Sequence, residues 1–189
     1  MGGTFEDQQD TFTDLGILMV LIIILVFIVM AAQFESLVDP FVIMFSIPFA
    51  FTGIVLGLAV TQTPLGVMAL IGVIMLMGIV VKNGIVLIDY TILCRERGMG
   101  IITSVVTAGK SRLRPVLMTT LTTVLGMIPM AVGTGEGSEM WRSMGMTVAW
   151  GLSVSTLITL IIVPTVYAVF AANGVKRRRR KIRKALRNN

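Results

Sequence analysis

Lys82 is a charged residue inside an otherwise uncharged apolar stretch, residues 65–88. In a membrane helix a charge at that depth costs about 2.5–3.5 kcal/mol on insertion scales, and such residues usually mark ion pathways or proton relays. Lys82 precedes Tyr90, at the end of the stretch, by about 12 Å of helix. Because half of the hydrocarbon layer is about 15 Å thick, snorkelling relieves the ammonium only in part. The chemistry indicated is the movement of a proton or an ion.

A charged Lys82 requires a carboxylate within about 4–6 Å to offset its desolvation. Asp89 shares its helical face but lies about 10 Å further along the axis. Lys82 therefore either pairs with a carboxylate from a polypeptide segment outside this sequence, or stays neutral or reaches a water-filled cavity. The amide of Asn83 can join the same hydrogen-bond network, although a lone Asn in a membrane helix more often joins helices together.

A second polar cluster follows Pro115 in another apolar stretch. Thr119, Thr122 and Thr123 stand at positions i, i+3 and i+4, so their hydroxyls share one helical face, while Thr120 points elsewhere. Thr123 lies about 12 Å beyond Pro115, a depth comparable with that of Lys82. The spacing fits a hydroxyl relay beside the ammonium. It fits equally well three hydroxyls that bond back to carbonyls of their own helix.

The elements that must position these side chains are membrane spans. The chain is 55% hydrophobic and 14% charged, with a mean hydropathy of +0.90 over 189 residues. This composition predicts an all-α membrane protein, a bundle of five transmembrane helices at about residues 15–32, 41–60, 65–88, 116–133 and 144–170. A short N-terminal segment, residues 1–14, precedes the spans, and a basic tail, residues 171–189, follows them.

Two further patterns concern the packing of the spans. Within the connection of residues 91–114, apolar residues recur at helical spacing ahead of a basic run, which predicts a short interfacial amphipathic helix. In the second span, Gly53 and Gly57 form a GxxxG pair. The pair indicates either ordinary close packing of helices or a specific dimer face.

The distribution of basic residues predicts the orientation. Of the sixteen Lys and Arg, nine lie in residues 176–187 and five between residues 95 and 114. The positive-inside rule places both segments in the cytoplasm, so the N-terminus of a five-span protein lies on the outer side of the membrane. Residues 1–14 contain four acidic residues and no Lys or Arg, unlike a cleavable signal. We therefore expect that further polypeptide belongs upstream.

Several classes of function are disfavoured. With no His, a single Cys and no Gly-rich phosphate loop, the sequence favours neither an enzyme nor a metal or cofactor site. The basic tail directly follows a membrane span, so we expect membrane lipids rather than nucleic acid as its partner. It serves either as a topology anchor attracted to anionic lipid or as a membrane-surface module.

Three motifs, in this order and spacing, resemble the resistance-nodulation-division efflux pumps. They are Gln-Phe-Glu-Ser at residues 33–36, Gly-Ile-Val-Val-Lys-Asn-Gly-Ile-Val-Leu-Ile-Asp at residues 78–89 and Arg-Leu-Arg-Pro-Val-Leu-Met-Thr-Thr at residues 112–120. The resemblance extends over residues 12–170. Its details favour the hydrophobe and amphiphile branch, the multidrug pumps, over the heavy-metal branch.

This resemblance implies a proton-driven antiporter that uses the proton gradient as its energy source and needs no cofactor. A complete pump of this family has twelve spans and two large periplasmic regions, and works as a homotrimer with a periplasmic adaptor and an outer-membrane channel. The present sequence is similar to the last five spans alone. In the family, a lysine at the position of Lys82 pairs with aspartates of the N-terminal half, and the positions of Arg112 and Thr119 belong to the same proton-relay network.

The sequence thus predicts a C-terminal transmembrane fragment that contributes the lysine side of a proton relay and does not transport alone. Lys82, Asn83, Arg112 and Thr119 are the expected relay residues. Further candidates, for the relay or for packing, are Thr122, Thr123 and Asp89. The alternative is a non-transporting accessory or structural membrane module that oligomerises through its helices.

Overall fold

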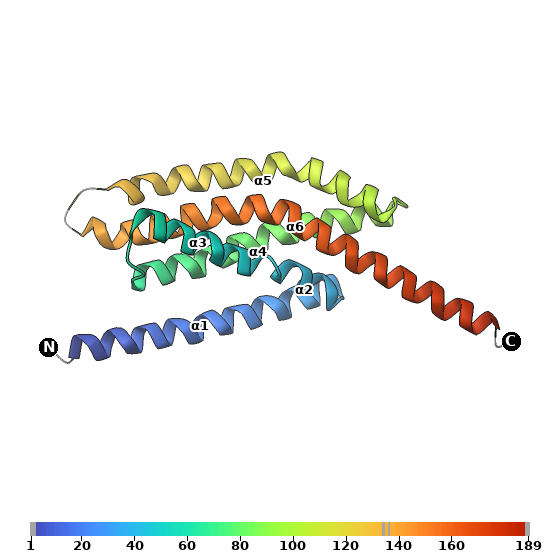
Figure 1. The fold of residues 1–189 in the computed structure, drawn as a ribbon, viewed down its shortest axis with the longest axis horizontal. Helices are drawn as coiled ribbons and strands as arrows, with labels where there is room; N and C mark the ends of the chain where they lie inside the picture. Colours follow the sequence, from blue (N-terminus) through green and yellow to red (C-terminus); the bar gives the residue numbers. More distant parts are fainter. Residues whose placement is uncertain (1–2, 134, 136, 188–189) are drawn as a thin grey trace.

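The residues that the structure describes fold into six helices joined by short turns (Figure 1). The computed structural model describes the backbone of residues 3–133, 135 and 137–187, and the side chains of residues 7–133, 135 and 137–172. The helices are α1 (Gly3–Phe34), α2 (Val38–Met44), α3 (Ile47–Thr61), α4 (Val67–Glu96), α5 (Ile101–Val132) and α6 (Ser138–Arg187). Within the described residues there is no β-strand, so the all-α prediction is confirmed.

Among the described residues, five stretches are long and apolar enough to cross a membrane. They are Asp7–Phe34, Val38–Thr61, Val67–Glu96, Ile101–Val132 and Ser138–Ala172. This agrees with the five spans expected from composition. The two ends of the described chain lie at opposite ends of the bundle in Figure 1, as an odd number of crossings requires.

The second span is interrupted, because α2 ends at Met44 and α3 begins at Ile47. Pro48 stands in the first turn of α3 and has no backbone N–H to donate to the carbonyl four residues earlier. The intervening Ser46 donates its N–H to Ile43 O at 3.0 Å and its hydroxyl to the same carbonyl at 2.6 Å. The side chain thus helps to satisfy the backbone where the helix breaks.

The connection expected at residues 91–114 is almost entirely helical. α4 continues to Glu96, a turn with Gly98 at a φ of +87° reverses the chain, and α5 starts at Ile101. α5 then runs through Pro115 without a break, so the expected interfacial helix is the first part of the fourth span rather than a separate element. Ser104 and Ala108 are fully buried there, so this part of α5 packs into the bundle.

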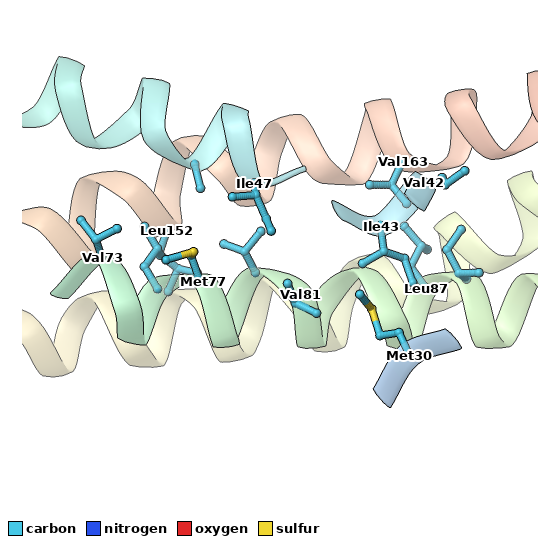
Figure 2. Close-up of a cluster of buried hydrophobic side chains, with 14 of the residues drawn as sticks. Met30, Val42, Ile43, Ile47, Val73, Met77, Val81, Leu87, Leu152 and Val163 are labelled. Atoms are coloured by element: carbon cyan, nitrogen blue, oxygen red, sulfur yellow. The ribbon is translucent and has the colours of Figure 1, made fainter. Parts of the chain in front are cut away.

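α6 is the central helix of the bundle and contacts α3, α4 and α5 (Figure 1). The main apolar core lies where α2, α3 and α6 meet α4. Figure 2 shows side chains from these helices directed toward one another, among them Ile43, Ile47, Val81 and Leu152. α1 adds Met30, which is 1% exposed.

Glycines allow the close approach of α3 to α6. A Cβ placed on Gly53 would lie 2.8 Å from Val154 Cβ and 3.3 Å from the backbone of Gly151. A Cβ on Gly57 would overlap Trp150 Cβ. The GxxxG pair of the second span therefore faces α6 of the same chain.

α1 is the outlying helix, with contacts to α2 and α4 (Figure 1). Only 6% of its most apolar window is buried within the chain. Large apolar side chains are exposed along much of its length, including Ile17, Leu21, Ile24 and Ile28. Such a surface suits lipid or another membrane segment.

We expect Gly57→Ala to lower the free energy of unfolding by about 1–3 kcal/mol, because the new methyl group meets Trp150 Cβ, which cannot swing away as a side-chain tip would. Thermal or denaturant unfolding of the chain in detergent measures this change. Gly126→Ala is the matched control, because among the described residues a Cβ there meets no atom within 4 Å. Equal losses of stability in the two variants would contradict the close α3–α6 contact.

Candidate functional site

An open groove of about 550 Å³ lies between α4 and α5, and it brings together five of the predicted site residues. α4 contributes Lys82 and Asn83 to its wall, and α5 contributes Thr119, Thr122 and Thr123. The remaining lining residues are Ile79, Val86, Pro115, Val116 and Met118. Residues 36 to 41 positions apart in the sequence therefore meet because α4 and α5 pack as antiparallel neighbours.

Lys82 also borders a second open space, of about 300 Å³, on the side of α4 that faces α1. That space is lined by apolar side chains of α1 and α4, including Leu25, Val29 and Ile85. Among the described residues lining either space, Lys82 is the only charged one. The ammonium thus lies on an exposed face of the bundle with no acidic side chain on the adjoining walls.

The three threonine hydroxyls of the groove each donate to a carbonyl of their own helix. Thr119 Oγ1 donates to Val116 O at 2.9 Å, Thr122 Oγ1 to Met118 O at 2.8 Å, and Thr123 Oγ1 to Thr119 O at 2.8 Å. A hydroxyl that donates in this way keeps lone pairs that can accept a hydrogen bond, and it can rotate to another acceptor. The back-bonding expected as one alternative is therefore present, and it leaves the relay geometry available.

Thr120 faces α6 rather than the groove. It is buried against α6, where its hydroxyl lies 3.1 Å from Thr156 Oγ1. This hydrogen bond joins the fourth and fifth spans. The expectation that Thr120 faces away from the groove holds, but its hydroxyl contributes to the α5–α6 contact.

Arg112 and Asp89 lie outside the groove. The guanidinium carbon of Arg112 is 4.8 Å from the ring centroid of Tyr90, a cation–π contact between α5 and the end of α4. Its Nε is buried and has no hydrogen-bond partner among the described residues. Asp89 is exposed on α4. The structure therefore places these two residues toward the turn between α4 and α5 rather than beside Lys82.

Sequence reasoning missed the polar residues of the last span. Ser153, Ser155, Thr156 and Thr159 lie within seven positions of one another on α6, in an otherwise apolar stretch. Three of them are buried, namely Ser155, Thr156 and Thr159. Their density could have been noticed in the sequence, but their common direction depends on how α6 packs.

The fold and the groove define a multi-pass membrane protein that carries a lysine within one of its membrane-spanning helices. A family model described as AcrB/AcrD/AcrF matches residues 1–171. The chain is 42% identical over 171 residues to the swarming motility protein SwrC of Bacillus subtilis (strain 168), covering 90% of this chain and 16% of SwrC. It is 38% identical over 166 residues to the cobalt-zinc-cadmium resistance protein CzcA of Cupriavidus metallidurans, covering 88% and 16%.

The chain is also similar to a multidrug resistance protein and to a heavy metal efflux pump of known structure. The multidrug resistance protein MdtC of Proteus mirabilis is 35% identical over 177 residues, covering 93% of this chain and 17% of MdtC. The crystal structure of a heavy metal efflux pump superposes with a TM-score of 0.80 at 30% identity, covering 89% of this chain and 16% of the pump.

The chain belongs to the AcrB/AcrD/AcrF family, and so to the resistance-nodulation-division transporters. It spans about one sixth of the length of the relatives that it matches, 16–17% in those described above. The resemblance stated from the three sequence motifs is confirmed at the level of the family.

Proposed function

We propose that this chain is the C-terminal transmembrane part of a proton-driven efflux antiporter, and that it contributes the lysine side of the proton relay. The observation that carries the proposal is the placement of Lys82. Its ammonium borders an open groove beside the hydroxyls of Thr119, Thr122 and Thr123, and none of the described lining residues is acidic. A charge at membrane depth needs a counter-charge, and the open groove has room for one.

The counter-charge in this proposal comes from the rest of the pump. A helix that carries carboxylates can pack onto the outer face of α4, between the groove and α1, where both spaces that adjoin Lys82 open. The exposed apolar surface of α1 supports a further membrane contact on the same side. The complete pump is then a trimer of the bacterial inner membrane that works with a periplasmic adaptor and an outer-membrane channel.

In the proposed relay, Arg112 does not contact Lys82 directly. It stacks on Tyr90, eight residues beyond Lys82 on α4, and its Nε has no described partner. We assign it to the electrostatic environment at one end of the relay. Asn83, directly beside Lys82, supplies an amide to the wall of the groove.

For the exported compounds we propose amphiphilic drugs rather than divalent metal ions. The multidrug resistance protein MdtC and the motifs of residues 78–89 and 112–120 support this choice. The names of CzcA and of the matched crystal structure point to metals. Transport assays should therefore test both amphiphilic drugs and divalent metal ions.

The second candidate function is an accessory membrane module that oligomerises through Gly53 and Gly57. The α3–α6 contact disfavours it, since both glycines already face α6 within the chain. Co-expression with the N-terminal part of such a pump separates the two functions. Restored efflux supports the transporter fragment, whereas an oligomer without efflux supports the accessory module.

We expect Lys82→Ala to abolish proton-driven efflux in the complete two-part pump, because loss of the ammonium leaves its partner carboxylates without a counter-charge, so that they stay protonated. Efflux of an amphiphilic dye and of divalent cations is measured against expression in the membrane. Lys110→Ala removes an exposed lysine of α5 outside the groove and should leave efflux intact. Full efflux by a well-expressed Lys82→Ala pump would refute the assignment.

We expect Thr119→Val to reduce efflux at least about tenfold, a loss of roughly 1.4 kcal/mol in the coupling step, because valine keeps the shape and removes the hydroxyl. The rate of dye efflux under a fixed pH gradient measures it. Thr165→Val is the control, since Thr165 is an exposed, back-bonded threonine that lies outside the groove. Thr120→Val is unsuitable because it breaks the bond to Thr156. Equal effects at positions 119 and 165 would contradict a relay role.

For orientation, we propose a periplasmic start and a cytoplasmic end. A reporter fused after residue 189 should then be active as a cytoplasmic fusion, and one inserted at residues 133–143 as a periplasmic fusion. The basic tail of residues 176–187, whose side chains lie outside the described ones, drives this orientation. Replacing the Lys and Arg residues of this tail by Gln should make the orientation of the chain in the membrane less uniform. The opposite reporter pattern in the unaltered chain would contradict the proposed topology.

A further inference from the structure

Thr159 is the one buried hydroxyl residue without a hydrogen-bond partner in the part of the chain that the structure describes. It lies on α6 and is 4% exposed. The other buried Ser and Thr side chains all have a partner. Three of these bonds go to a carbonyl of the residue's own helix, among them the bond of Thr147 to Ser143 O at 2.8 Å. A buried hydroxyl left without a partner is costly, so Thr159 needs an explanation.

A small space between α4, α5 and α6 is lined in part by Thr159. Its polar wall comes from Asn83, Ser155, Thr156 and Thr159, and its apolar wall from Val80, Leu87, Val116 and Leu160. The volume open to the centre of a water molecule is about 10 Å³. That is near the smallest space that holds a single water molecule, which also requires two to four polar partners.

We propose that this space binds one water molecule, which accepts a hydrogen bond from the Thr159 hydroxyl and bridges to the Asn83 amide. The hydroxyls of Ser155 and Thr156 provide further polar atoms on the same wall, and Thr156 is already paired with Thr120. The water thus satisfies the unpartnered hydroxyl of Thr159 and adds a polar link between α4 and α6. An apolar cavity of this size would stay empty, whereas this wall supplies donors and acceptors.

Asn83 connects this site to the groove, since it lines both spaces. A water held behind Asn83 fixes the orientation of its amide on the side away from Lys82. The water site therefore continues the polar wall of the groove into the interior of the bundle. Thr159 lines neither the groove nor the second open space beside Lys82. It therefore acts through Asn83, as a positioning residue.

The competing explanation is that Thr159 turns its hydroxyl to the Ser155 carbonyl and the space stays dry. The two explanations predict opposite results for the isosteric change Thr159→Val. In a dry site, valine removes a hydroxyl that gains little from burial, so stability stays the same or rises. In a hydrated site, valine leaves a buried water or a polar wall with one partner fewer, so stability falls.

We therefore expect Thr159→Val to lower the Tm of the purified chain in detergent by about 2–4 °C. Thr159→Ser should retain most of the stability because it keeps the hydroxyl. The control is Thr147→Val, an equally buried threonine of the same helix that is back-bonded. A Thr159→Val variant that matches Thr147→Val, or that is more stable than the unaltered chain, overturns the proposal.

A double-mutant cycle tests the bridge itself. Because one water links the two side chains, the losses of stability from Thr159→Val and Asn83→Leu should be strongly non-additive, whereas Thr147→Val with Asn83→Leu should be additive. A structure of the unaltered chain that resolves ordered solvent should show the water between Thr159 and Asn83. Additive losses, or a map with Thr159 bonded to Ser155 O and no density in the space, would disprove it. None of these measurements involves transport, so their failure leaves the proposed function standing.

Discussion

The close approach of α6 to its neighbours is the constraint on which the rest of the bundle depends. Lipid is as apolar as a leucine side chain, so membrane helices associate through packing and interhelical hydrogen bonds rather than through the hydrophobic effect. Here the contact is made by positions that lack a side chain. Gly53 and Gly57 meet α6 from α3, and a Cβ on Gly145 of α6 would lie 3.0 Å from the backbone of Ala131 on α5.

Because α6 occupies the centre, α4 and α5 each bury one face against it and leave another face open. The polar residues divide between these faces. Thr120 turns toward α6 and pairs with Thr156, while its neighbour Thr119 lines the groove beside Lys82. One residue of helix rotation, about 100°, thus separates a structural hydroxyl from a proposed relay hydroxyl.

The charge of Lys82 and the isolation of α1 both concern what adjoins the bundle in the membrane. A charge at membrane depth is tolerated when another segment supplies its counter-charge, whereas an apolar helix that buries little of its surface suits either lipid or another membrane segment. The family membership and the short share of each relative that this chain covers agree with that reading. In the proposed pump, further spans would bring a counter-charge to the open spaces on the two sides of Lys82.

The sequence by itself determined the all-α class, the five spans and the family, because each depends on local properties: the length of apolar runs and the identity of short motifs. It also indicated which threonines share a face. Only the tertiary structure decided what those faces meet. The direction of Thr120 toward Thr156, the stacking of Arg112 on Tyr90 and the unpartnered hydroxyl of Thr159 all depend on the rotation of one helix against another. That rotation is set by the sum of many side-chain contacts between distant segments, which periodicity within a single helix does not contain.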